Sequence, residues 1–137
     1  MAISHFTDIG FVMREILLVA VGGAFGSVLR YYVGVWGVRI AGTGFPWGTL
    51  TVNLVGSFVI GVVVEMIVRK FDGSPALRLL LMTGVLGGFT TFSSFALDTV
   101  SLFERGALGL AITYVAISLV ASLAAVFAGL SLVRALA

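Results

Sequence analysis

Charged residues are absent from three long stretches of this chain. Residues 106–133, 40–64 and 79–97 contain no Asp, Glu, Lys or Arg, and they are 28, 25 and 19 residues long. A helix needs about 20 apolar residues to cross the hydrocarbon of a bilayer. A fourth apolar zone, residues 16–38, is interrupted only by Arg30. The sequence therefore predicts four membrane-spanning helices.

The composition leaves little material for a domain in water. Of the 137 residues, 60% are hydrophobic and 10% are charged, whereas soluble domains carry about 25% charged residues. We therefore expect an all-α integral membrane protein whose surroundings are the lipid bilayer. The expected single four-helix membrane domain comprises residues 1–137, with spans at approximately 15–38, 49–68, 75–103 and 106–132.

Several function classes are excluded by residues that the chain lacks. There is no cysteine, and the only histidine is His5, so thiol chemistry, disulfides and Cys/His metal sites are not expected. The sequence contains no nucleophile–base pair of the kind that would indicate an enzyme. The net charge of +2 is too small to indicate a nucleic-acid partner. The neutral to acidic residues before Arg14 are unlike the basic start of a cleaved signal peptide.

The stretch GVLGGFTTFSSFALD, residues 84–98, is unusual for a membrane helix. Its three glycines weaken a helix, and its four hydroxyl side chains can bond to backbone groups that a break would free. We therefore expect the third helix to be broken at mid-membrane, which is tolerated only where the break is buried in protein or lines a cavity. Carbonyl groups at such a break suit a hard cation, and the N-terminus of the next half-helix favours an anion.

Three phenylalanines, Phe89, Phe92 and Phe95, follow one another at intervals of three. Such side chains ordinarily face lipid or fill space between helices. Aromatic ring edges, however, carry partial positive charge. Rings that present their edges to a narrow polar path would stabilise an anion without a fixed charge.

Other polar side chains fall inside the predicted spans. Tyr114, Ser118 and Ser122 occupy one helix face about 80° wide. They either line a polar pathway, or each serine bonds to its own helix carbonyl four residues earlier. Asn53 either makes an interhelical hydrogen bond or lines a pore. Arg30 either reaches the far interface with its long side chain or faces a wet vestibule.

The segment GGFTTFSSF, preceded by Asn53 in the second span and by Gly22, Gly26 and Arg30 in a GxxxGxxxR pattern, resembles the Fluc/CrcB fluoride channels. The glycines by themselves favour close helix packing. The resemblance extends over the chain in size, spans, short loops and motif order. It implies a fluoride-selective channel that lies in the bacterial cell (inner) membrane. This channel would export fluoride passively and relieve its toxicity. It further implies an antiparallel, dual-topology homodimer with two pores and a central structural sodium ion.

The resemblance also implies roles for individual residues. The implied ion-pore residues are Asn53, Phe92, Phe95, Tyr114, Ser118 and Ser122. Arg30 would lie near an aqueous vestibule, and the backbone carbonyls of Gly87 and Thr90 would bind Na+. The hydroxyl track of the family continues for one more helical turn, where this chain has Val126.

Two other classes of membrane protein are open at this point. Small dual-topology multidrug transporters also pack four short spans per chain, but their chemistry needs a proton-exchanging carboxylate deep in a span, whereas Glu15 lies at the mouth of the first. In a non-transporting assembly protein, the glycines and phenylalanines would serve packing alone.

Overall fold

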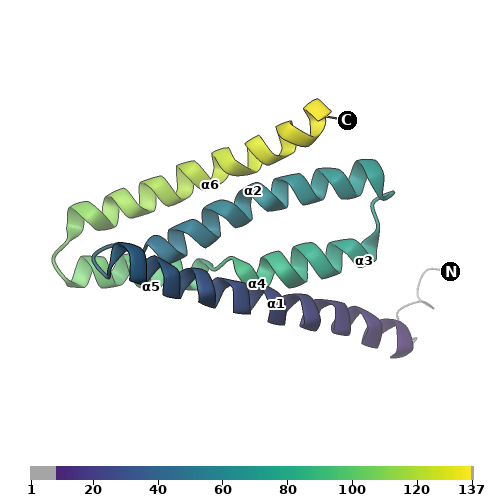
Figure 1. The fold of residues 1–137 in the computed structure, drawn as a ribbon, viewed down its shortest axis with the longest axis horizontal. Helices are drawn as coiled ribbons and strands as arrows, with labels where there is room; N and C mark the ends of the chain where they lie inside the picture. Colours follow the sequence, from purple (N-terminus) through teal and green to yellow (C-terminus); the bar gives the residue numbers. More distant parts are fainter. Residues whose placement is uncertain (1–8, 137) are drawn as a thin grey trace.

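The computed structural model describes residues 9–136, and helices account for nearly all of them (Figure 1). Four segments are long and apolar enough to cross a membrane: α1 (Ile9–Ala41), α2 (Trp47–Lys70), a divided segment (Pro75–Glu104) and α6 (Leu108–Leu136). The divided segment comprises α3 (Pro75–Leu77), the π-helix η2 (Arg78–Leu86), α4 (Gly87–Phe89) and α5 (Phe92–Glu104). The predicted all-α fold with four spans is confirmed. His5 lies outside the described residues.

The four segments run up and down, so that α2 and α6 point in the same direction (Figure 1). The start of α1, the turn from α2 to α3 and the end of α6 therefore lie at one end of the molecule. The turn between α2 and α3 is tight because Asp72 and Gly73 both adopt positive φ angles, of 47° and 69°. Ser74 then caps α3 by accepting a hydrogen bond from the Leu77 N–H at 3.4 Å.

Glycines let the helices approach one another backbone to backbone. A Cβ added to Gly22 would lie 2.9 Å from the Gly84 Cα, and one added to Gly26 would collide with the Val85 carbonyl oxygen. The parallel helices α2 and α6 meet in the same way, since a Cβ on Gly129 would lie 2.9 Å from the Val62 nitrogen. The expectation that Gly22 and Gly26 serve close helix packing is confirmed.

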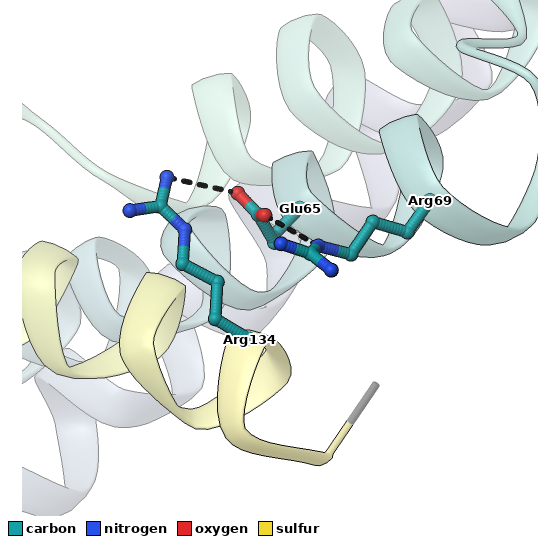
Figure 2. Close-up of polar contacts among 3 residues, drawn as sticks. All are labelled: Glu65, Arg69 and Arg134. Carbon is teal, nitrogen blue, oxygen red and sulfur yellow. Dashed lines mark hydrogen bonds and ion pairs between the residues drawn. The ribbon is translucent and has the colours of Figure 1, made fainter.

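An ion cluster joins α2 to the end of α6 (Figure 2). Glu65 pairs with Arg69 on its own helix at 2.7 Å and with Arg134 of α6 at 3.2 Å. Only 12% of the Glu65 side chain is exposed, against 56% for Arg134. The cluster ties the two parallel helices together one turn beyond their glycine contacts.

Large hydrophobic side chains cover much of the outside of the described chain. Phe25, Ile40, Phe92, Val120 and Phe127 are each more than half exposed. Few residues are buried completely, and the largest of these are Tyr114, Ile67, Leu102 and Val52. Such a surface suits hydrocarbon or a second protein rather than water.

Candidate functional site

Helical structure in the third segment pauses at Thr90 and Thr91. Helix α4 ends at Phe89, and Thr90 has the extended angles φ −84° and ψ 158°. Thr91 is also extended, with φ −155° and ψ 113°, and α5 begins at Phe92. The pause begins two residues after Gly88, and hydroxyl residues in and beside it contribute to its hydrogen bonding.

Asn53 of α2 pairs with the backbone of Thr91 through both ends of its amide. Its Nδ2 donates to the Thr91 carbonyl oxygen at 3.0 Å, and its Oδ1 accepts from the Thr91 N–H at 2.8 Å. The Thr91 hydroxyl oxygen in turn accepts from the Ser94 N–H at 3.1 Å. Backbone groups that the pause frees are thereby satisfied by side chains, as apolar surroundings require. The interhelical hydrogen bond considered for Asn53 is therefore present.

This bonding releases the two carbonyl groups that were predicted to bind a cation. In a continuous α-helix, the Gly87 oxygen accepts from the N–H of Thr91, and the Thr90 oxygen accepts from the N–H of Ser94. Both N–H groups instead donate to side chains. The Gly87 and Thr90 carbonyl oxygens are the type of ligand that hard cations prefer. The described residues hold no group of three or more His, Cys, Asp or Glu side chains that could bind a metal.

A groove of about 340 Å³ lies between α2, α5 and α6 and is called the polar groove below. Five of the six predicted pore residues line it: Asn53, Phe92, Phe95, Ser118 and Ser122. No charged side chain is among its lining residues. An ion in this groove would meet amide, hydroxyl and aromatic groups beside aliphatic side chains such as Leu119, and no fixed charge.

The Ser118 hydroxyl is buried beside this groove without a hydrogen-bond partner in the described chain. The residue is 6% exposed. By contrast, the hydroxyls of Thr90 and Thr99 donate to the carbonyl four residues earlier, at 2.9 and 2.8 Å. The alternative considered for these serines was a hydrogen bond to the helix carbonyl four residues earlier. Ser118 does not make this bond. An unpaired buried hydroxyl is costly, which makes Ser118 a candidate to bind something that enters the groove.

The three phenylalanines do not share one helix face, because the pause separates them. Phe89 ends α4 and packs toward Gly56 of α2, where its ring carbon would lie 3.3 Å from an added Cβ. Phe92 and Phe95 follow the pause, with ring centroids 5.6 Å apart and planes inclined by 42°. Phe92 is 77% exposed, so its ring stands at the open side of the polar groove.

Tyr114, the sixth predicted pore residue, lies next to the polar groove rather than in its wall. It is completely buried, and its ring centroid is 5.3 Å from that of Phe95. Its hydroxyl donates to Asp98 Oδ2 at 3.4 Å. Asp98, a carboxylate within α5, was not among the predicted site residues. Its position three residues after Phe95, on the same helix, is the signal that could have indicated it.

Arg30 lines a second groove, of about 350 Å³, whose lining residues come from α1, α2 and the start of α5. This groove also contains Thr49, Thr91 and Ser94. Thr91 is the one residue that lines both this groove and the polar groove. No carboxylate of residues 9–136 forms an ion pair with Arg30, so its positive charge is directed to a cavity rather than to a protein partner.

Comparison with known proteins gives a consistent result. The sequence pattern of the family described as "CrcB-like protein, Camphor Resistance (CrcB)" matches residues 17–130. The chain is 66% identical over 122 residues to the fluoride-specific ion channel FluC of Agrobacterium fabrum, a match that covers 89% of this chain and 98% of that protein. It is 63% identical over 125 residues to the protein of the same description from Rhizobium johnstonii, covering 91% of this chain and all of that one. It is 52% identical over 122 residues to the protein of the same description from Rhodospirillum centenum, a match that covers 89% of this chain and 97% of that protein.

Proposed function

Because this chain belongs to the CrcB-like protein family, we propose that it is a fluoride-selective channel that exports fluoride passively and relieves its toxicity. It is a multi-pass membrane protein with four spans, and we place it in the inner membrane of a bacterial cell, because the relatives that it matches come from bacteria. The family is one of ion channels rather than enzymes. The observation that carries the proposal is the unpaired Ser118 hydroxyl in an uncharged polar groove that also holds Asn53 and two phenylalanines.

The groove suits a small, strongly hydrated anion. Fluoride gives up many water contacts when it leaves water, so a pathway must offer several donors in their place. The Ser118 and Ser122 hydroxyls and the second Nδ2 hydrogen of Asn53 are such donors. The ring edges of Phe92 and Phe95 add weaker positive potential. A lysine or arginine in the same wall would hold the anion instead of passing it on.

The open side of the polar groove supports a dimer. Phe92 is 77% exposed in the single chain, and a second copy would close the groove opposite α2, α5 and α6. We propose an antiparallel, dual-topology homodimer, in which each groove becomes one of two pores. The pause at Thr90 and Thr91 would then lie near the middle of the membrane, at the dimer interface.

Such an interface would also suit a central sodium ion. Each chain offers the Gly87 and Thr90 carbonyl oxygens, whose helical donors bond elsewhere. Two chains related by symmetry would supply four oxygens to a hard cation. Sodium would hold the two interrupted segments together rather than take part in anion transfer.

Fluoride release from liposomes that contain the purified chain tests the function. The vesicles are loaded with potassium fluoride, a potassium ionophore balances the charge, and an ion-selective electrode follows fluoride outside. We expect rapid fluoride release and no comparable chloride release. Equal release of both anions would refute the selectivity. Electroneutral, proton-driven export of organic cations without fluoride release would instead indicate a transporter that uses Asp98.

A further inference from the structure

Ser57 lines the polar groove but is not one of the predicted pore residues. Its hydroxyl makes no hydrogen bond within the described chain, although it lies in a helix where it could bond to the carbonyl four residues earlier. Thr90 and Thr99 of the same chain do bond in that way. A polar group in an apolar span raises the free energy of the folded chain when it has no hydrogen-bond partner. The hydroxyl of Ser57 is therefore available to bind an ion or a water molecule in the groove.

The helices α2 and α6 run in one direction (Figure 1) and come closest where Gly61 faces Gly129, since a Cβ added to Gly129 would lie 3.2 Å from the Gly61 carbonyl carbon. Before this contact, polar residues of both helices line the polar groove together: Asn53 and Ser57 of α2, and Ser118 and Ser122 of α6. The groove therefore has polar side chains on each helix.

The contact between Gly61 and Gly129 closes the space between the two helices. A Cβ added to Gly61 would collide with the Val126 carbonyl oxygen and lie 3.1 Å from the Leu130 nitrogen. Val126 carries no hydroxyl, and neither Gly61 nor Val126 lines the groove. Ser57 and Ser122 are therefore the last hydroxyl residues on α2 and α6 before the two backbones meet.

We propose that Ser57 is an ion-contacting residue, and that α2 and α6 both supply hydroxyl donors at the end of the polar groove where the two helices meet. This inference rests on the proposed fluoride channel and deepens it. An anion that passes Ser122 would also meet the Ser57 hydroxyl, because both residues line the polar groove. This additional donor compensates for the missing hydroxyl at Val126, because the anion exchanges more of its water contacts before it leaves the groove.

Substitution of Ser57 in the liposome assay tests the inference. Ser57→Ala should lower the rate of fluoride release about tenfold, the factor that corresponds to ~1.4 kcal/mol and to one hydrogen bond with an anion. It should also raise the fluoride concentration that gives half-maximal release. Ser57→Thr, which keeps the hydroxyl, should release fluoride at a rate within about twofold of the original chain. Thr99→Val is the matched control, because the Thr99 hydroxyl bonds to its own helix and lines a different, apolar groove.

The outcomes separate this inference from the function on which it rests. Equal release by the original chain and Ser57→Ala, with the same amount of dimer in gel filtration, would overturn the role of Ser57 and leave the channel intact. An original chain that releases no fluoride would overturn both. A loss of rate in Thr99→Val as large as in Ser57→Ala would show that any removed hydroxyl has this effect, and would also overturn the role of Ser57.

Discussion

Replacing Asn53 by alanine tests how the pause in the third segment is held. The substitution removes two hydrogen bonds to Thr91, of 3.0 and 2.8 Å, and leaves the N–H and carbonyl of that residue without their side-chain partner. Hydrogen bonds between membrane helices contribute about 0.6 kcal/mol on average, and a buried group left unpaired costs about 1–3 kcal/mol. For two groups we expect a loss of ~1–6 kcal/mol in the free energy of unfolding.

The measurement is thermal denaturation of the protein in detergent, combined with the liposome assay. Each kcal/mol lowers Tm by about 4 °C in a chain of this size, so Asn53→Ala should lower Tm by at least several degrees. Fluoride release should be lost as well, because α5 would no longer be held in position against α2. Asn53→Asp would keep the acceptor for the Thr91 N–H but lose the donor to the Thr91 carbonyl, and its negative charge would repel the anion.

Thr51→Ala is the matched control for this experiment. Thr51 lies on the same helix, but it is exposed and no hydrogen bond of its side chain is present in the described chain. We expect its Tm and its fluoride release to equal those of the original chain. If Asn53→Ala behaved like Thr51→Ala in both measurements, the idea that the amide holds the two extended residues in place would be wrong.

Two further predictions concern the aromatic rings and the helix packing. Phe92→Ile or Phe95→Ile should stop fluoride release without preventing dimer formation in gel filtration, because isoleucine fills space but has no positive ring edge; unchanged release would remove these rings from the mechanism. Gly26→Val should prevent assembly of the folded chain, since its Cβ would collide with the Val85 carbonyl oxygen; a folded variant with unchanged Tm would show that α1 can move away from η2 without loss of stability.

Local sequence patterns predicted several features of the site. The hydroxyl residues at 118 and 122 follow helical spacing and do line one groove. The glycines and hydroxyl residues of 84–98 mark the segment in which helical structure pauses. The three-residue spacing of Phe89, Phe92 and Phe95 would place them on one face only in a continuous helix, and the pause at Thr90 and Thr91 separates Phe89 from the other two.

Other features depend on contacts between residues far apart in the chain. Asn53 meets Thr91 across 38 residues of sequence, and helical spacing within one segment contains no information about such a pair. The same holds for Tyr114, which belongs to the hydroxyl row by spacing but turns to Asp98 and packs against Phe95. A helix face can be predicted from its own residues, whereas its neighbour depends on how the helices pack.

The sequence by itself determined that this chain is an all-helical membrane protein with four spans, because the cost of a charge in hydrocarbon is the same in any fold. It also determined which short segment cannot remain a regular helix. Only the tertiary structure decided that α2 and α6 pack against each other, that Ser57 and Ser122 line one groove, and that Asn53 reaches Thr91. The alignment of α2 with α6 follows from the close contacts of Gly61 and Gly129, because two residues without side chains let the backbones meet at this crossing.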